Sequence, residues 1–293
     1  MMKVSGFTFV RNAIKYDYPV KESIMSVLPL CDEFIVAVGN SQDATRELIQ
    51  TISSEKIRII DTIWDESLKK GGRILAVETD KAFAEVTSDA DWCIYIQADE
   101  VMHEDQLPTI RTAMERYKDN PQIEGLLFSY LHFYGNYNYI GDARKWYPKE
   151  VRIIRKRSDI KSYRDAQGFR KGEIKLQVTP IDAQIFHYGW VKPPNKQADK
   201  RKYFESLYHA PDPKLEEVTE WDYTDSTRLK RFDGTHPKVM LERINRLNWS
   251  FAYDPAKATY TLKERFLAFF EKRLKRKLFE FRNYKIVDND RIQ

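Results

Sequence analysis

The sequence predicts an α/β fold in which a single, mostly parallel central sheet is flanked by helices on both faces. Two observations support this. Strand-like and helix-like segments alternate in βαβαβαβ order over the N-terminal third of the chain, a pattern typical of parallel sheets with crossover helices. The 293 residues, 42% hydrophobic and 13% aromatic, are enough to bury a sizeable core. Such sheets bind ligands in the crevice at the carboxyl ends of their strands.

Each predicted element follows from a run of β-preferring residues or from apolar residues at helical spacing. Strands are expected at residues 4–10, 34–38, 57–60 and 92–96, and helices at residues 20–28, 43–52 and 73–86. The last strand, in the stretch WCIYIQADEVM, leads directly into Asp99 and Glu100. We therefore expect Asp99 to lie in the ligand crevice.

Composition excludes several classes of protein. Lys and Arg number 49 against 44 Asp and Glu, a net charge of +5, which is too little for a dedicated nucleic-acid-binding face but suits a local phosphate site. Cys31 and Cys93 lack metal-ligand spacing and are expected to be free thiols in a reducing compartment. Neither a signal peptide nor a run of about 18 apolar residues is found. The sequence thus predicts a cytoplasmic protein.

The first loop excludes two common nucleotide sites. A dinucleotide site needs G-x-G-x-x-G after the first strand, and a P-loop needs G-x-x-x-x-G-K-[ST]. The segment here is VRNAIKYD, which contains no glycine. A sugar-nucleotide pyrophosphorylase also needs a glycine-rich first loop, and Gly6 inside the strand does not supply one.

Four loop motifs instead occur in a fixed order. They are V-S-x-x-x-x-x-R-N from Val4, DEFIVAVGNSQDAT from Asp32, GGR ending at Arg73, and ADE ending at Glu100. This ordered set resembles the family 2 glycosyltransferases over roughly residues 3–195. The resemblance implies the A-type glycosyltransferase fold, also called the nucleotide-diphospho-sugar transferase fold. It also implies transfer of a sugar from a nucleotide-diphosphate donor to a hydroxyl acceptor, with inversion.

The resemblance further implies a divalent metal, Mn²⁺ or Mg²⁺, bound by Asp99. The family commonly has D-A-D here, and this chain has Gln97 at the first aspartate position, so Gln97 is expected to hydrogen-bond a sugar hydroxyl of the nucleotide. Hard oxygen ligands and a metal would neutralise charge on the leaving diphosphate. His187, in IFHYGWVKPP, matches a histidine that can join the metal. The alternatives are a solvated acidic turn at Asp99 and a core hydrogen bond at His187.

The resemblance places the nucleotide-binding residues in the same loops: Phe9, Arg11, Asn12, Gly39, Asn40, Ser41, Arg73 and Gln97. The family's early aspartate after the second strand is missing here, and Asp43 is expected to cap the following helix rather than bind a ligand. An inverting transfer also requires a base. The carboxylates considered for it are Asp142, Glu150, Asp159, Asp165, Glu173 and Asp182. We predict Asp165, whose segment SYRDAQGFRKGE lies where the family's acceptor loop falls, and an ion pair with Arg164 or Arg170 is the alternative role.

Composition shifts after Pro194, which divides the chain into a predicted catalytic domain at residues 1–195 and a helical extension at residues 196–293. Residues 261–282 predict an amphipathic helix with a Leu and Phe stripe edged by basic residues. Packing on the catalytic domain or in a homodimer is the favoured role. The alternative is peripheral contact with anionic lipid at the inner face of the membrane.

The sequence thus predicts a glycosyltransferase with a carbohydrate or lipid-linked glycan acceptor, in surface polysaccharide or lipopolysaccharide assembly. A nucleotide-sugar-binding protein of the same fold without turnover is the alternative, because Gln97 replaces an aspartate. A basic RNA-binding module is a more distant one.

Overall fold

The computed structural model describes residues 2–68, 70–209, 212–224, 228–254, 273 and 281–287. Its first half contains β1 (Val4–Val10), α1 (Val20–Val27), β2 (Glu33–Gly39), α2 (Thr45–Gln50), β3 (Ile57–Thr62), α3 (Arg73–Ala84) and β4 (Trp92–Tyr95). These strands run side by side in the order β3-β2-β1-β4, all parallel. The predicted alternation of strands and helices is therefore confirmed for this half of the chain.

The sheet as a whole is mixed rather than mostly parallel. The second half adds β5 (Glu100–Met102), α4 (Leu107–Tyr117), β6 (Gly125–Tyr134), β7 (Asn136–Gly141), β8 (Lys149–Ile154), β9 (Lys161–Tyr163), β10 (Gly168–Lys171) and β11 (Ile174–Trp190). β8 is antiparallel to both β4 and β6, and β10 is antiparallel to β9 and β11. Short connections such as the one at Gly135, with φ of 74°, permit only antiparallel neighbours, because a parallel pair needs a long crossover.

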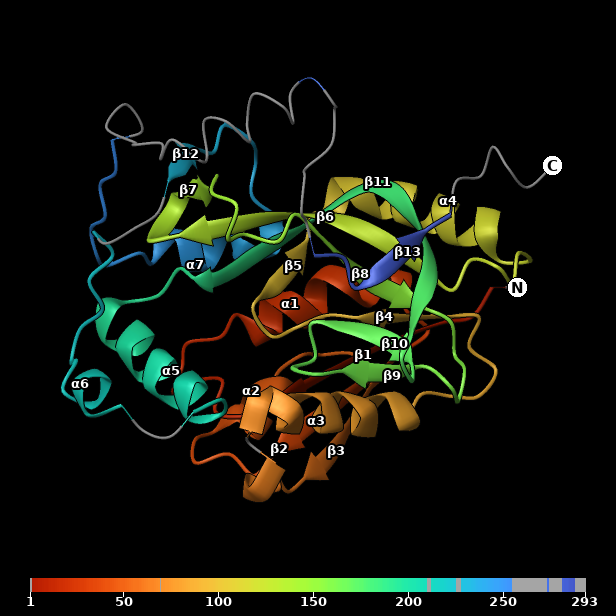
Figure 1. Ribbon diagram of the computed structural model, residues 1–293, viewed down its shortest axis with the longest axis horizontal. Coiled ribbons are helices and arrows are strands. Elements are labelled where there is room, and N and C mark those ends of the chain that lie inside the picture. The colour runs from red at the N-terminus through yellow and green to blue at the C-terminus, as the bar shows by residue number, and fades with distance from the viewer. Residues whose placement is uncertain are drawn as a thin grey trace.

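Alternation along the strands sends apolar side chains to both faces of the sheet. In β2, Phe34, Val36 and Val38 join one buried cluster with residues of α1, α2 and α4. Ile35 and Ala37 join a second cluster with residues of α3, β10 and β11. The helices α1 and α4 accordingly lie on the side of the sheet away from α3 (Figure 1). With helices on both faces, the carboxyl ends of the parallel strands lie together at one edge of the sheet.

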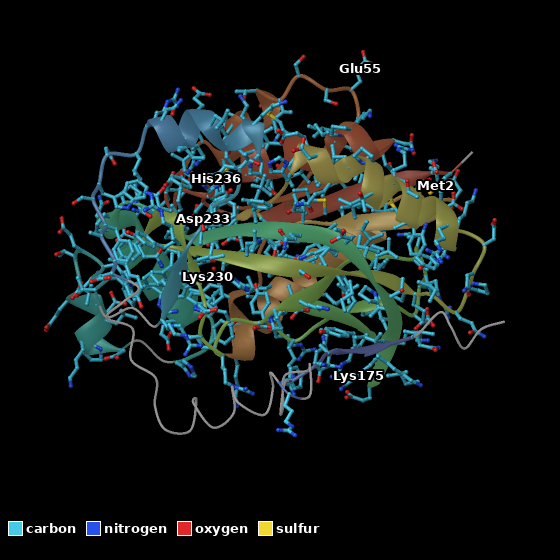
Figure 2. The ribbon with its side chains drawn as sticks, turned by 90° about the horizontal axis from the view of Figure 1, so that it is seen from above. Met2, Glu55, Lys175, Lys230, Asp233 and His236 are labelled. Carbon is cyan, nitrogen blue, oxygen red and sulfur yellow. The ribbon has the colours of Figure 1, made fainter. Side chains whose placement is uncertain are left out.

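Residues after Trp190 continue the same structure. Helix α5 (Pro194–Ser206) is followed by α6 (Pro213–Glu216), β12 (Leu229–Arg231), α7 (Leu241–Asn245) and β13 (Tyr284–Ile286). β12 pairs with β7, and β13 pairs with β11. His236 receives a hydrogen bond from, or donates one to, the Tyr188 hydroxyl at 2.9 Å. Figure 2 shows Lys230, Asp233 and His236 in the half of the molecule away from Met2.

The predicted C-terminal helix at residues 261–282 lies outside the described residues except for 273, 281 and 282. The division of the chain at residue 195 stays a prediction. In the described part of the chain, no helix combines the length and hydrophobicity needed to cross a membrane.

A buried ion pair joins β5 and β8. Glu100 and Arg152 are each 0% exposed, and two hydrogen bonds of 2.8 Å run from the guanidinium to the carboxylate. The Tyr130 hydroxyl donates to the same carboxylate at 2.7 Å, and the backbone N–H of Gln97 donates to it at 3.1 Å. Arg152 also donates to the Gln167 carbonyl at 2.9 Å. The pair is thus satisfied by hydrogen bonds on both sides, as a buried charge requires.

Replacing Arg152 by Met should lower the free energy of unfolding by about 3–5 kcal/mol, because Glu100 would remain buried without its partner. Urea denaturation of the parent and the variant at neutral pH measures this. The double variant Glu100→Gln with Arg152→Met is the control, and it should recover part of the loss since it removes both charges. A single variant as stable as the parent would contradict the structural role of the pair.

Candidate active site

A cavity of about 340 Å³ opens at the carboxyl ends of β1 and β4, where the α/β architecture places ligands. Helix α5 covers it from the other side. Its wall is rich in aromatic rings, and its charged residues are few. The lining residues include Phe9, Arg11, Tyr18, Trp64, Gln97, Asp99, Asp165, Gln167, His187, Gln197, Lys200, Arg201, Tyr203 and Tyr208. This size and chemistry suit a small ligand with polar and flat apolar parts.

Asp99 points into the cavity just beyond β4, while its neighbour Glu100 points into the core. Asp99 is 8% exposed, and its Oδ2 accepts a hydrogen bond of 3.0 Å from Lys200 Nζ. Its Oδ1 lies 3.8 Å from His187 Nε2. Burial alone would raise the pKa of Asp99, but the ammonium group of Lys200, which also donates a hydrogen bond to this carboxylate, holds that pKa well below its usual range. Asp99 is therefore an ionised carboxylate at neutral pH.

A chain of hydrogen bonds fixes the proton on His187. His132 Nε2 donates to the Tyr147 carbonyl at 2.7 Å, and burial lowers the pKa of His132 to about 3. Its Nδ1 is therefore a bare acceptor, and it lies 3.2 Å from His187 Nδ1. Burial also lowers the pKa of His187, so neutral His187 carries its proton on Nδ1. The lone pair of Nε2 is then free beside Asp99, in the form in which histidine binds metals.

Gly189 leaves the space that a ligand at this pair would need. A Cβ on residue 189 would lie 2.7 Å from Asp99 Oδ2 and 2.8 Å from His187 Nε2, which is too close for any side chain. The carboxylate oxygen and the imidazole nitrogen form a donor set that Mn²⁺ accepts and that Mg²⁺ accepts in part. These two residues therefore fit a divalent metal.

Of the predicted nucleotide-binding residues, Phe9, Arg11 and Gln97 line the cavity. Arg11 lies over the Trp64 ring, with 5.4 Å from its guanidinium carbon to the ring centroid, and donates to Glu66 at 2.7 Å. Gln97 Nε2 donates to the Ala166 carbonyl at 3.1 Å and to the Tyr95 hydroxyl at 3.3 Å. The side-chain amide of Gln97 thus holds the loop that carries Asp165 in place.

Asn12, Gly39, Asn40, Ser41 and Arg73 lie outside this lining set. The backbone N–H of Asn12 donates to Ser41 Oγ at 3.0 Å. The backbone carbonyl of Asn40 accepts a hydrogen bond from Arg11 Nε at 3.3 Å. A Cβ on Gly39 would lie 2.3 Å from Trp64 Nε1, so only glycine admits the indole there. In this structure Gly39 and Asn40 position wall residues. Arg73 is exposed at the first residue of α3.

Asp165 lines the cavity from a loop with unusual backbone geometry. Both of its neighbours are left-handed although neither is glycine, with φ of 56° at Arg164 and 63° at Ala166. Such conformations cost free energy and are frequent at functional sites. The Tyr208 hydroxyl donates to Asp165 Oδ2 at 3.1 Å, which leaves Oδ1 as an acceptor. Among the described residues, the expected alternative pairs with Arg164 and Arg170 do not form, since Arg170 instead contacts Asn283 and Glu173.

The other carboxylates considered as bases lie outside the lining set. Asp142 is paired with Arg228 and Asp159 with Arg157. Glu150 is the one buried close to the site, 5% exposed, and its Oε2 has no hydrogen-bond partner in the described structure. Burial raises the pKa of Glu150 to about 8. It is therefore mainly protonated at neutral pH and lies beneath the strand that follows Gln167.

Helix α5 supplies wall residues that the sequence did not identify. Besides Lys200, it places Gln197, Arg201 and Tyr203 in the cavity. Gln197 is 1% exposed, and its Oε1, Arg201 Nε and Trp64 Nε1 are buried without partners in the described part of the chain. Such orphaned polar atoms are costly unless a ligand or water satisfies them. The sequence signal was only a charged helix with little amphipathic pattern, so its docked face could not be predicted.

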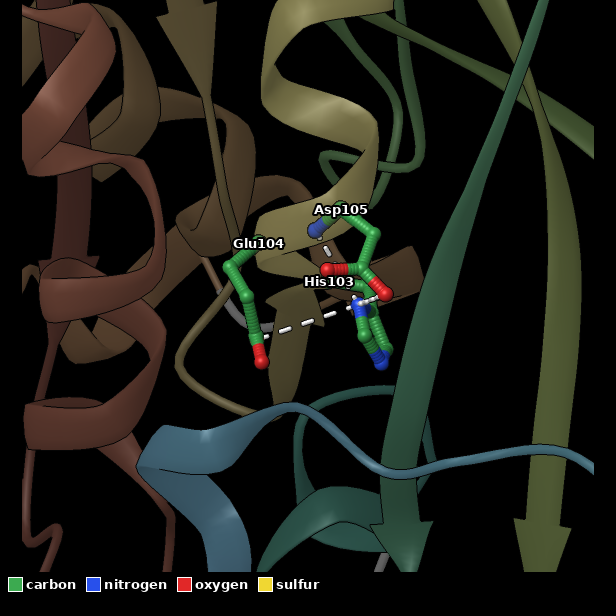
Figure 3. A group of neighbouring side chains, drawn as sticks. All are labelled: His103, Glu104 and Asp105. Atoms are coloured by element: carbon green, nitrogen blue, oxygen red, sulfur yellow. Dashed lines mark hydrogen bonds and ion pairs between the residues drawn. The ribbon is translucent and has the colours of Figure 1, made fainter.

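A second group of possible metal ligands does not fit a metal. His103, Glu104 and Asp105 place one ligand atom each within 4.8 Å of the others (Figure 3). However, His103 Nδ1 accepts a hydrogen bond from the Asp105 amide at 3.2 Å, and Nε2 lies 3.0 Å from Thr235 Oγ1. Because both ring nitrogens are engaged, this group is a cap on the short helix η4 (Glu104–Gln106).

No protein-family model matches the sequence, and neither does any curated protein. Among solved structures, the chain is similar at low identity to several proteins. TarS 1–349 of S. aureus has 11% identity and a TM-score of 0.39 over 74% of this chain and 69% of that chain. Another structure of that fragment contains UDP, with 10% identity and a TM-score of 0.38 over 74% and 70%.

Glucosyl-3-phosphoglycerate synthase from Mycobacterium tuberculosis, solved with Mn²⁺, UDP and phosphoglyceric acid, has 16% identity and a TM-score of 0.30 over 45% of this chain and 43% of that chain. Mannosyl-3-phosphoglycerate synthase from Rubrobacter xylanophilus has 17% identity and a TM-score of 0.31 over 45% and 41%. All four TM-scores are below 0.5, so these similarities support no inference about what this chain binds.

The raised pKa of Glu150 predicts a pH dependence of stability. Its pKa is about 8 in the folded protein against an ordinary 4.5. A carboxyl with a raised pKa contributes stability that is fully present below about pH 4.5 and is lost as the pH rises through about 8. The variant Glu150→Gln removes this loss. Its Tm relative to the parent should therefore increase between about pH 5 and about pH 8.

Differential scanning fluorimetry at several pH values measures this difference. Glu173→Gln is the matched control, because the Glu173 side chain is 92% exposed. A constant difference in Tm between Glu150→Gln and the parent across this range would show that Glu150 titrates normally.

Proposed function

We propose that this protein is a glycosyltransferase that moves a sugar from a nucleotide-diphosphate sugar to a hydroxyl acceptor. One observation carries the proposal: Asp99, the free lone pair of His187 and the free oxygen of Asp165 face one aromatic-walled cavity at the carboxyl edge of the sheet. A metal-binding pair and a base that line one ligand cavity are what transfer from a diphosphate requires. The ordered loop motifs of family 2 support the same assignment.

In this proposal, Asp99 and His187 hold Mn²⁺ or Mg²⁺, which when bound neutralises charge on the departing diphosphate. Gln97, with Arg11 and Phe9, binds the nucleotide. The aromatic side chains around Trp64 and Tyr203 exclude water and offer flat faces to a base or a sugar. Asn12, Gly39, Asn40, Ser41 and Arg73 belong to the nucleotide site as supporting residues.

Asp165 takes the proton of the acceptor hydroxyl at Oδ1 while Tyr208 holds Oδ2. Attack on the anomeric carbon from the side opposite the leaving diphosphate inverts its configuration. The catalytic domain in this proposal is residues 1–195, with α5 as a contributor from beyond it. A carbohydrate or lipid-linked glycan is the proposed acceptor, as in surface polysaccharide or lipopolysaccharide assembly, with the protein in the cytoplasm. The C-terminal residues 261–282 are the proposed contact with a second copy or a membrane.

A nucleotide-sugar-binding protein without turnover is the second candidate. It is favoured by Gln97, whose amide donates to the protein itself, and by Lys200, which is bonded to Asp99. Incubating the protein with UDP-, GDP- and dTDP-sugars in the presence of Mn²⁺ tests the two. Release of free nucleotide diphosphate supports the enzyme, and thermal stabilisation without release supports the binding protein.

The variant Asp99→Asn should remove the gain in nucleotide-diphosphate affinity that Mn²⁺ provides, because an amide is a poor ligand for a divalent cation. Calorimetric titration of nucleotide diphosphate with and without Mn²⁺ measures that gain. The control is Asp105→Asn, since the Asp105 side chain is 79% exposed and belongs to the group that does not fit a metal. A gain equal to the parent's would show that Asp99 is not a metal ligand.

The variant Asp165→Asn should keep donor binding and lose transfer or donor hydrolysis by about 10²-fold or more, as expected for removal of a general base. Asp159→Asn, which removes an exposed ion pair with Arg157, should behave as the parent does. If Asp165→Asn turns over normally, the base is another residue, and Glu150 is the next to test.

A further inference from the structure

Lys200 occupies a place beside Asp99 that neither the loop motifs nor the proposed roles above explain. It lies in the second turn of α5, and its side chain is only 12% exposed. Its Nζ donates to Asp99 Oδ2 at 3.0 Å and to the Gly189 carbonyl at 2.8 Å. An ammonium group has three donors, so one remains for a ligand in the cavity that Lys200 lines.

The surroundings of Lys200 hold its ammonium group in place. Nζ lies 5.0 Å from the centroid of the Tyr18 ring, at a distance where a cation is attracted to the ring face. Tyr16 and Tyr203 stack with centroids 4.9 Å apart, which docks the same helix on the β1 loop. The lysine is therefore positioned by packing as well as by its ion pair.

The charged residues that line the cavity are compatible with an anionic ligand. Among the lining residues, Arg11, Lys200 and Arg201 are cations, and Asp99 and Asp165 are anions. Arg11 and Arg201 also contact Glu66 and Glu205 at the rim. Lys192 lies nearby with its Nζ on the Asp17 carbonyl, and burial lowers the pKa of Lys192 well below its usual range. An anionic group that enters beside Asp99 thus meets Lys200 first.

We propose that Lys200 is a permanent counter-cation of the site, which binds the diphosphate of the donor directly and competes with a divalent metal for Asp99. The inference rests on the proposed function, since it concerns the same donor. It predicts that Lys200 strengthens diphosphate binding and weakens metal binding. Diphosphate binding persists when metal is removed, because the lysine charge remains. Metal binding is weaker than the pair Asp99 and His187 would otherwise allow, because the ammonium group already neutralises the carboxylate.

The test compares the parent with Lys200→Met, which keeps the length of the side chain and removes its charge. In EDTA, calorimetric titration with UDP, GDP, ADP and dTDP should give at least about tenfold weaker binding by the variant, the loss expected for one charge-assisted hydrogen bond. In the absence of nucleotide, Mn²⁺ titration followed by electron paramagnetic resonance should give at least about tenfold tighter binding by the variant.

Matched variants separate this role from a merely structural one. Lys202→Met removes the same charge from the same helix at a residue whose Nζ contacts the Glu216 carbonyl instead, and both affinities should equal the parent's. Lys200→Arg should keep most of the metal-free binding. If Lys200→Met folds poorly because Asp99 is left unpaired, the double variant Lys200→Met with Asp99→Asn removes both charges and should still lose metal-free diphosphate binding.

A parent that binds nucleotide diphosphates in EDTA and a Lys200→Met variant that binds them equally would overturn this inference and leave the proposed function intact. So would a variant that binds both the nucleotide and Mn²⁺ more weakly, since that result indicates only a structural role. A parent that binds none of the nucleotides, with or without Mn²⁺, overturns the proposed function and this inference together.

Discussion

The ion pair between Glu100 and Arg152 is the interaction on which the rest of the site depends. The Glu100 carboxylate accepts a hydrogen bond from the backbone N–H of Gln97, at the start of the loop that carries Asp99. The guanidinium donates to the carbonyl of Gln167 at the end of the loop that carries Asp165. One buried pair thus fixes two loops that are far apart in sequence. Loops held in this way can tolerate the strained backbone around Asp165.

The adjacent carboxylates Asp99 and Glu100 show how one position in a strand register decides a chemical role. Glu100 belongs to β5, where its side chain turns inward and meets a full set of donors. Asp99 precedes that strand and turns to the cavity, where Lys200 is its only hydrogen-bonding cation among the described residues. Burial works against both charges, and each is retained because a basic side chain opposes it. Glu150 has no such hydrogen bond at Oε2, and its pKa rises instead.

The parallel half of the fold could be predicted because the signals for it are local. Alternating side chains in β2 and apolar spacing in α3 appear within short windows, and the strand ends then place Phe9, Arg11, Gln97 and Asp99 together. The mixed half could not, because the pairing of β8 with β4, or of β11 with both β5 and β6, depends on contacts between distant segments. His132 was missed for the same reason. It is one polar residue in an apolar strand, and its effect on the His187 proton exists only once β6 and β11 are neighbours.

Helix α5 shows why a domain boundary drawn from composition is a poor guide to the extent of a site. β11 ends at Trp190, and Pro193 and Pro194 begin α5. The sequence changes character there, yet this helix returns over the cavity. Lys200 contacts Asp99, and Tyr208 contacts Asp165. One segment thus contacts both Asp99 and Asp165. The backbone N–H of Gly72 donates to the Leu207 carbonyl at 3.0 Å and holds that segment against the sheet domain. A ligand that draws either carboxylate away from its partner must therefore also change the contacts of α5, and so the two halves of the site are coupled through this helix.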